Sequence, residues 1–308
     1  MTAKVLVTGA SGFLGRALVP ALLALGETVI ATGRRACPFP SHARLVWRSV
    51  DLSEPTQPLR ELLCGVGLIY HLSWSTIPAE SNLAPSEDAR VNIVGSLRLL
   101  ENVESEMRPR VVFASSGGTV YGRLLHAPAA EDHPLNPLSA YGVSKRTVES
   151  YLEFFALLGK IRPVSLRIGN VFGPGQDASR PFGAITHFTR SALAGAPIRL
   201  FGDGSIVRDY VYIEDAVDAL LRAGHAEQAS HALNIGSGKG HSLNDVIGAL
   251  QEHFHEPIQV ERMPARLFDA PVSVLDPGKA LREIGWSPRV SFEEGMRRTI
   301  ASLTKTAQ

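Results

Sequence analysis

The stretch Val5-Leu6-Val7-Thr8-Gly9-Ala10-Ser11-Gly12-Phe13-Leu14-Gly15 decides the fold. Its first apolar run predicts a strand, and the apolar stripe that begins at Phe13 and continues to Leu22 has the period of a helix. The glycines between them permit a tight turn in which backbone N–H groups approach a pyrophosphate, whose charge the N-terminus of the helix favours. In this strand–turn–helix context the stretch predicts a dinucleotide-binding turn.

The same alternation of strands and helices continues along the chain. Further strands are predicted at 28–32, 45–50, 68–72, 111–114 and 164–168, with helical stretches between them, the clearest at 87–103. Such alternation predicts an α/β fold of the Rossmann type, a doubly wound parallel sheet covered by helices on both faces. Near residue 169 glycine- and proline-rich loops become frequent, which indicates a smaller, mixed C-terminal substrate lobe. We expect residues 1–168, with a returning segment at about 209–235, to form the Rossmann domain, and 169–208 with 236–308 to form the lobe.

Composition and charge exclude several classes of protein. The chain has 308 residues, 44% of them hydrophobic, which is enough for one large domain or two smaller ones around a buried core. Its net charge of +1 gives no broad field for a polyanion, and no apolar run approaches the ~20 residues that span a bilayer. The two cysteines, Cys37 and Cys64, have neither metal-ligand spacing nor a disulfide framework. We therefore expect a cytoplasmic protein that binds no nucleic acid, membrane or metal.

The end of the second predicted strand bears on the cofactor. An acidic residue there usually binds the ribose 2′-hydroxyl of NAD, but this chain has Arg34 and Arg35. Two guanidinium groups suit a 2′-phosphate, so the sequence favours NADP without excluding NAD. The alternative is that both arginines merely face solvent. Asp51, after the third strand, is a candidate acceptor for the adenine amino group, or else an ordinary loop aspartate.

Tyr141 and Lys145 form the candidate catalytic pair, because residues four apart lie on one face of a helix. Tyrosine has a pKa of about 10, so work as a base near pH 7 requires a shift of roughly 3 units, or about 4 kcal/mol. A nearby ammonium group stabilises the phenolate. A hydroxyl partner is available upstream, since the run from Val112 to Gly122 ends a predicted strand and its Ser116 lies 25 positions before Tyr141.

Together these features resemble the extended short-chain dehydrogenase/reductase family, of the NAD-dependent epimerase/dehydratase type, and in particular nucleotide-sugar epimerases of the UDP-glucose 4-epimerase type. The resemblance covers nearly the whole chain. Further matches are the runs at 71–73, 91–96, 167–174 and 202–211, and Arg266 with Asp269 three residues on.

The resemblance implies roles for individual residues. Tyr141, Lys145, Ser116 and Thr119 would be catalytic. The cofactor would be bound by Gly9, Ser11, Gly12, Phe13, Leu14, Gly15, Arg34, Arg35, Asp51, Leu52, Leu72, Ser73, Asn92, Ala114, Tyr141 and Lys145. A nucleotide diphosphate sugar would be bound by Ser75, Ser116, Asn170, Arg208 and Arg266. It also implies a homodimer formed by the helices near 87–103 and 141–158, whose apolar faces alternatively pack internally.

The sequence departs from the family at the catalytic hydroxyl. In the family's epimerases this residue lies four positions before the tyrosine of a Val-Tyr-Gly triplet, and counting back from Tyr121 gives Gly117. Counting forward along the strand gives Ser116, which we favour, with Thr119 as a possible second hydroxyl. The related 4,6-dehydratases carry an Asp-Glu pair where this chain has Gly118 and Thr119, so dehydration is disfavoured.

Three functions remain open at this point. The first is epimerisation, most simply at C4 of a UDP-sugar, through transient oxidation to a 4-keto intermediate. The alternative is an NADPH-dependent nucleotide-sugar 4-ketoreductase, which uses the same residues once, and a more remote alternative is a non-catalytic dinucleotide sensor. The sugar and the nucleobase depend on loops near 74–82, 176–190 and 262–270, whose conformations the sequence does not give.

Overall fold

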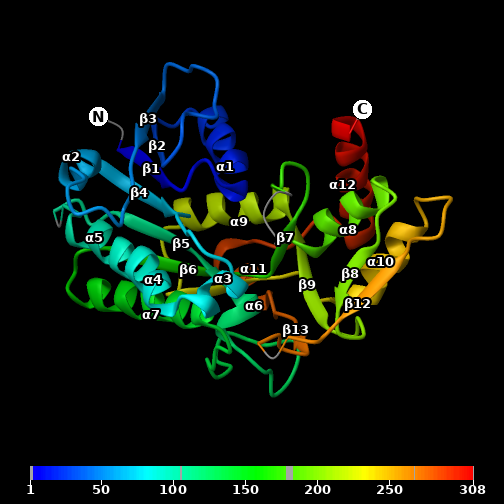
Figure 1. Ribbon diagram of the computed structural model, residues 1–308. Helices are drawn as coiled ribbons and strands as arrows, with labels where there is room; N and C mark the ends of the chain where they lie inside the picture. Colours follow the sequence, from blue (N-terminus) through cyan, green and yellow to red (C-terminus); the bar gives the residue numbers. More distant parts are fainter. Residues whose placement is uncertain (1–2, 105, 178–182, 267, 308) are drawn as a thin grey trace.

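The computed structural model describes residues 3–104, 106–177, 183–266 and 268–307. Its main sheet has seven parallel strands in the order β10-β6-β5-β4-β1-β2-β3, which confirms the predicted doubly wound α/β fold (Figure 1). The strands are β1 (Lys4–Thr8), β2 (Val29–Gly33), β3 (Leu45–Ser49), β4 (Val66–His71), β5 (Arg110–Ser116), β6 (Arg162–Ile168) and β10 (Ala232–Ile235).

Helices cover both faces of this sheet because its central strands are apolar on both sides. On β1, Val5 and Val7 face one core, shared with α1 (Phe13–Ala24) and α9 (Ile213–His225). Leu6 faces the other, shared with α2 (Leu59–Leu63), α5 (Gly95–Glu101) and α7 (Ala140–Leu157). Burying one such side chain contributes about 1.5–3 kcal/mol, so the two layers hold the sheet between them.

The predicted helix at 87–103 is one helical segment with a change of hydrogen bonding. It consists of α4 (Pro85–Asp88), a π-helix η1 (Ala89–Val94) and α5. Before it lies α3 (Pro78–Leu83), and α6 (Gly117–Val120) is a single turn after β5. Single π-turns inside helices often occur at functional sites, and this one lies beside the residues discussed below.

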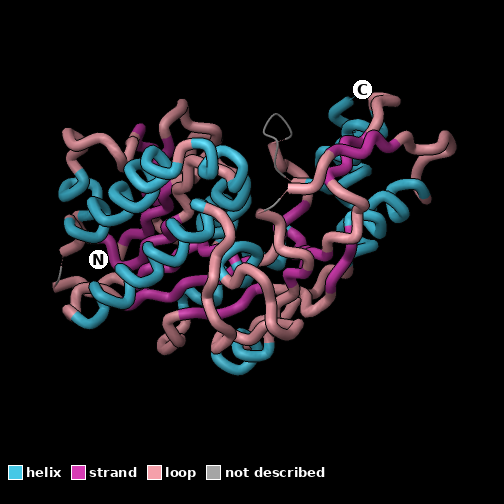
Figure 2. Tube along the Cα trace, turned by 60° about the horizontal axis from the view of Figure 1, so that its bottom comes forward, coloured by secondary structure: helices cyan, strands magenta, loops and turns pink. Residues whose placement is uncertain are grey.

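The smaller lobe contains a mixed four-stranded sheet and a separate strand pair (Figure 2). The sheet is built from β7 (Asn170–Phe172), β9 (Val207–Tyr212), β11 (Gly240–Ser242) and β13 (Val272–Ser273). The pair is β8 (Ile198–Phe201) with β12 (Val260–Met263). Its helices are α8 (Ala184–Leu193), α10 (Leu243–Gln251) and α12 (Phe292–Ala307), whereas α11 (Gly278–Ile284) contacts β10 of the main sheet.

The returning segment differs in part from the expectation. Helix α9 does pack on the main sheet, but β9 pairs with β7, β11 and β13 in the smaller sheet, and the seventh strand of the main sheet is β10. The pairing of β9 with β7 joins segments about forty residues apart, which a local sequence pattern does not contain.

Two further expectations bear on the described part of the chain. No helix in it has the length and apolar character needed to cross a membrane. Nor does it contain a group of three or more histidine, cysteine or acidic side chains arranged to hold a metal ion. Cys37 and Cys64 are both free and exposed.

Candidate functional site

The glycine turn after β1 has the form that the sequence predicts. Gly9 has φ +66°, and a Cβ there would lie 2.7 Å from the Ser73 backbone. A Cβ on Gly15 would lie 2.5 Å from Cα of Ala10, so this glycine lets α1 pack closely on the turn. Gly12 caps α1 without a side-chain hydrogen bond, which leaves backbone donors at the helix start. These glycines allow the tight turn and the close approach of α1, and the backbone donors at the helix start fit a pyrophosphate.

The ends of β2 and β3 lie together beside this turn. Arg34 and Arg35 follow β2 and are exposed. Asp51 accepts hydrogen bonds from N and Oγ of Ser53 at 2.9 and 2.7 Å. Burial raises the pKa of Asp51, but these hydrogen bonds and the Arg34 guanidinium together hold it below its usual range. Leu52 is buried. The edge therefore presents two cations and one carboxylate near the expected adenosine position.

A buried histidine joins the ends of β1 and β4 to the start of α5. His71 Nδ1 lies 2.8 Å from Thr8 Oγ1, and His71 Nε2 lies 2.8 Å from Ser96 Oγ. Since Ser96 Oγ donates to the Asn92 carbonyl, it accepts from His71 Nε2, so this nitrogen carries a proton, and in the neutral ring Nδ1 accepts from the Thr8 hydroxyl. Burial, with the Lys145 ammonium, lowers the pKa of His71 to about 3.

Tyr141 and Lys145 lie on one face of α7, as predicted. The Lys145 Nζ is 5.6 Å from the centroid of the Tyr141 ring and donates to the Ala114 carbonyl at 2.7 Å. Lys145 is only 4% exposed, whereas Tyr141 is half-buried. Ser139 caps the helix start through the Gly142 N–H, which fixes the turn that carries Tyr141.

Trp74, in the predicted specificity loop near 74–82, contacts both members of the pair, a role that the sequence did not indicate. Its indole ring lies over the Lys145 ammonium, with Nζ 3.7 Å from the ring centroid, and meets the Tyr141 ring edge-on at 5.7 Å. The ammonium is thus covered by an aromatic face, an interaction of about 0.5–2 kcal/mol. Local sequence offers no signal for this contact, because 71 positions separate Trp74 from Lys145.

The geometry at the end of β5 bears on whether the catalytic hydroxyl is expected at position 116 or at position 117. A Cβ on Gly117 would lie 2.4 Å from Leu275 Cδ1 and 2.9 Å from the Arg167 carbonyl, so no side chain fits there. A Cβ on Gly118 would lie 3.2 Å from Asn170 Oδ1 and 3.9 Å from Ser116 Oγ. Ser116 and Asn170 therefore approach each other across Gly118.

Thr119 has a different environment. Its hydroxyl donates to the Ser116 carbonyl at 3.5 Å, and its own carbonyl packs on Gly142, the residue after Tyr141. Thr119 thus supports the contact between α6 and α7. The role of Ser116 as the catalytic hydroxyl stays a prediction.

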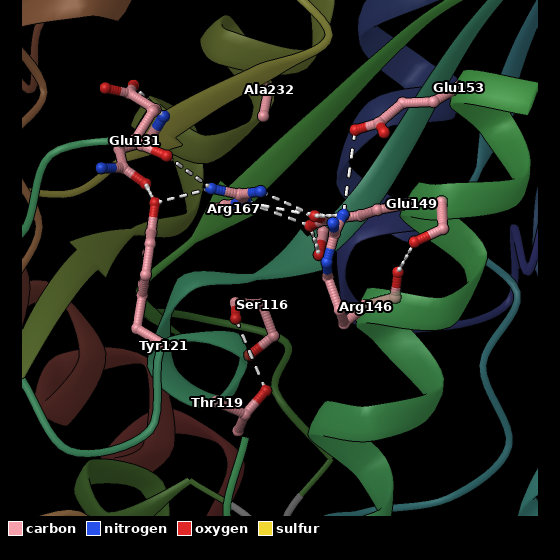
Figure 3. A network of polar contacts seen from close by, with 12 residues as sticks. Ser116, Thr119, Tyr121, Glu131, Arg146, Glu149, Glu153, Arg167 and Ala232 are labelled. Carbon is pink, nitrogen blue, oxygen red and sulfur yellow. Dashed lines mark hydrogen bonds and ion pairs between the residues drawn. The ribbon is translucent and has the colours of Figure 1, made fainter. Parts of the chain in front are cut away.

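A buried polar network joins β5, β6 and α7 (Figure 3). The Arg167 guanidinium pairs with Glu149 at 2.8 Å, and both side chains are almost wholly buried. Ser115 donates to Glu149 at 2.5 Å, and Arg167 also donates to Tyr121 Oη at 3.0 Å. Because Glu149 lies one helical turn after Lys145, this pair anchors α7 to the sheet.

Asn92 and Ser75 form part of the wall of the site. The Asn92 amide oxygen accepts from the Ser75 N–H at 3.0 Å, while its amide nitrogen donates to Thr76 Oγ1 and Asp88 Oδ1, both at 3.0 Å. Asn92 is 3% exposed, so its side chain shapes the segment after β4. Direct contact of Asn92 or Ser75 with a ligand stays a prediction.

The two arginines expected to bind phosphates meet at one carboxylate in the smaller lobe. Asp269 accepts from Arg208 at 3.4 Å and from Arg266 at 2.8 Å. Arg208 is mostly buried and also donates to the Ala270 carbonyl at 2.7 Å, whereas the Arg266 side chain is 38% exposed. Two cations share one anion, so this part of the lobe carries a net positive charge. Of the predicted specificity loops, 178–182 and residue 267 lie outside the described residues.

Known proteins resemble this chain over its full length. Residues 5–236 match the model of the NAD dependent epimerase/dehydratase family. A UDP-glucose 4-epimerase of Mycolicibacterium smegmatis is 34% identical over 312 residues, covering 99% of this chain and 100% of that protein. A dTDP-4-dehydro-6-deoxyglucose reductase of Escherichia coli is 29% identical, and the match covers 97% of both proteins.

Solved structures of UDP-glucose 4-epimerases have the same fold as this chain. The UDP-glucose 4-epimerase of Thermotoga maritima, solved with UDP-glucose, has a TM-score of 0.91 at 33% identity over 99% of this chain and 100% of that one. The UDP-glucose 4-epimerase of Thermus thermophilus, solved with NAD, has a TM-score of 0.89 at 33% identity over 98% and 99% of the two chains. The cofactor is accordingly a nicotinamide dinucleotide. The family model, the relatives, the glycine turn and the Tyr141/Lys145 pair agree. The chain belongs to the NAD-dependent epimerase/dehydratase family.

Proposed function

We propose that this enzyme is a UDP-sugar 4-epimerase. The observation that carries the proposal is the arrangement of Tyr141, one turn before the buried Lys145 ammonium, on α7 beside the end of β5. Sequence identities of 34% and 33% to two UDP-glucose 4-epimerases support this proposal. The missing acid–base pair at Gly118 and Thr119 disfavours dehydration.

In this proposal the chain binds and orients the sugar and moves one proton. Arg208 and Arg266 hold the diphosphate, and Asn170 helps to position the sugar. Tyr141, as phenolate, takes the proton of the C4 hydroxyl, directly or through Ser116. A bound nicotinamide dinucleotide supplies the acceptor and then the donor of the C4 hydride.

The charge of Lys145 has two tasks in this scheme. Its field stabilises the phenolate, for which roughly 4 kcal/mol is needed at neutral pH. Its remaining donor positions suit the hydroxyls of the nicotinamide ribose. The cofactor cradle comprises the turn at Gly9 and the start of α1, where backbone N–H groups meet the pyrophosphate.

The test is incubation of the purified enzyme with UDP-glucose and no added nicotinamide, followed by separation of the nucleotide sugars. UDP-galactose should accumulate until the two epimers reach equilibrium. A matched Tyr141→Phe enzyme should still bind cofactor through the other residues of the cofactor site and lose turnover by about 10²–10⁴-fold, since it lacks the general base. Inertness of the wild-type enzyme towards UDP-sugars would refute the proposal.

A second candidate is an NADPH-dependent 4-ketoreductase. It is favoured by the exposed Arg34 and Arg35 after β2, together with the 29% identity to the Escherichia coli reductase. These arginines lead us to propose a preference for NADP over NAD. Stoichiometric oxidation of NADPH by a nucleotide 4-keto sugar, with no epimerisation of UDP-sugars, would support this candidate over the first.

We also propose a homodimer built on α7. Along its outer face Val143, Phe154, Leu157 and Leu158 are 49%, 49%, 85% and 53% exposed, and Tyr151 lies between them at helical spacing. The apolar stripe continues onto the neighbouring η1, which contacts α7. A second copy of the chain, with its α7 antiparallel to the first, would cover this face.

A cytoplasmic location is proposed from the free, exposed cysteines.

A further inference from the structure

Asp88 is a fully buried carboxylate beside the catalytic turn of α7. It is 0% exposed, and it belongs to α4, just before the π-helix. Its Oδ2 accepts from Ser144 Oγ at 2.5 Å, and Oδ1 accepts from Asn92 Nδ2 at 3.0 Å and from the Thr76 hydroxyl. All three donors are neutral. Burial of a charge without an ionic partner is costly, so this position requires an explanation.

The donors belong to two parts of the site. Ser144 is the residue immediately before Lys145, on the turn of α7 that also carries Tyr141. Thr76 follows the Trp74 ring that covers the Lys145 ammonium. Through these two contacts one carboxylate ties the catalytic turn to the segment after β4.

The charges around Lys145 show what Asp88 adds. Burial lowers the pKa of Lys145 well below its usual range, and the carboxylates of Glu149 and Asp88 oppose this shift. Glu149, however, is already paired with Arg167 at 2.8 Å and lies 3.7 Å from Arg146. Of the two, only Asp88 has no cation within ion-pair distance among the described residues.

Two further titratable groups lie near the ammonium. His71 on β4 brings no negative charge, and burial lowers its pKa to about 3. Tyr141 on α7 is the proposed base, whose phenolate the ammonium stabilises during the reaction. Trp74 and Phe113 present aromatic rings. Among the described residues, neither the buried ammonium nor the buried Asp88 carboxylate has an ion-pair partner within 4 Å, whereas Glu149 has Arg167.

We propose that Asp88 is a positioning residue of the active site, which holds the Tyr141/Lys145 turn through Ser144 and whose charge balances the Lys145 ammonium. The inference deepens the proposed function, because it concerns how the same pair is held. It predicts energetic coupling between Asp88 and Lys145, although neither touches the other through a direct ion pair.

A double-mutant cycle on melting temperature tests this coupling without substrate or cofactor. Asp88→Asn, which keeps the shape, should lower the melting temperature by several degrees in the wild-type chain. In a Lys145→Met chain the same substitution should raise it, because it then removes an uncompensated buried charge. If Asp88→Asn alone does not fold, the double variant should still fold. An equal drop in both backgrounds would overturn the proposal.

The pH dependence of NAD(P) binding tests the charge at the site itself. Affinity should fall as pH rises through the pKa of Lys145, and Asp88→Asn should move this midpoint down by about 1 unit or more, since an opposite charge is lost. The control is Glu87→Gln, which removes one negative charge at the position next to Asp88. The Glu87 side chain is exposed and paired with Arg90, so its loss should leave the midpoint unchanged. An unmoved midpoint in Asp88→Asn contradicts the inference. Neither readout needs turnover, so inertness towards UDP-sugars would refute the proposed function alone.

Discussion

Replacement of Gly117 by alanine tests the geometry at the end of β5. The new Cβ would lie 2.4 and 2.9 Å from the two Cδ atoms of Leu275 and 2.9 Å from the Arg167 carbonyl, whereas carbon contacts are usually about 3.5–4.0 Å. Such overpacking costs about 1–3 kcal/mol. The lower entropy of the unfolded alanine chain offsets about 0.4–1 kcal/mol of this. We expect a net loss of about 1–2 kcal/mol.

Chemical denaturation of a small variant set measures this loss. Leu275→Ala alone should cost about 2–5 kcal/mol, as for a buried leucine. In that background Gly117→Ala should cost less than in the wild type, because both Cδ atoms are gone, giving a coupling of at least about 0.5 kcal/mol. The control is Gly248→Ala on α10, where a Cβ meets open space, and which should stabilise by about 0.5–1 kcal/mol. Additive effects, or a stabilising Gly117→Ala, would refute the contact.

The same contacts bear on catalysis. If Ser116 supplies the hydroxyl, Ser116→Ala should lose most turnover, and Gly117→Ser should not restore it, because the new side chain has no room towards the substrate. Restored turnover in the double variant would place the hydroxyl at position 117 and contradict the assignment.

Three further predictions concern the cofactor edge, acid stability and assembly. Replacing Arg34 and Arg35 by alanine should weaken NADP binding by about tenfold or more, from the loss of charge-assisted hydrogen bonds, and leave NAD binding nearly unchanged in titrations; equal weakening of both would contradict the 2′-phosphate role. His71 has a folded pKa of about 3, below its unfolded value of about 6.5, so the stability it contributes is present above pH 6.5 and falls by about 2 kcal/mol at pH 5. Denaturation of His71→Gln should show a smaller loss of unfolding free energy between pH 7 and pH 5. An equal loss in the variant and the wild type would argue against a neutral ring. Phe154→Asp with Leu157→Asp should yield a monomer by light scattering, and a monomeric wild-type protein would rule out the proposed interface.

Local patterns predicted the parts of the structure that depend on local contacts. The strand, glycine turn and helix at 4–24 form because neighbouring residues set the backbone and the buried faces. The pairing of Tyr141 with Lys145 follows from the helical period alone. These features were confirmed as drawn from the sequence.

Other features depend on contacts between distant segments. Strand β9 pairs with β7, which lies about forty residues earlier in the chain. No local sequence pattern reveals this pairing. Asp88 meets Ser144 across 56 positions, and Gly117 is constrained by Leu275. The counting ambiguity between Ser116 and Gly117 could be addressed only once β5, β6 and the Leu275 side chain were placed together.

The most direct test of the account follows the hydrogen at C4. UDP-glucose carrying deuterium at C4 is incubated with the enzyme, and the UDP-galactose formed is analysed by mass spectrometry and NMR. If one bound cofactor takes and returns the same hydride, the product keeps its deuterium at C4 and no oxidised sugar is released. Loss of the label to solvent, or release of a 4-keto sugar with reduced cofactor, would contradict the central claim.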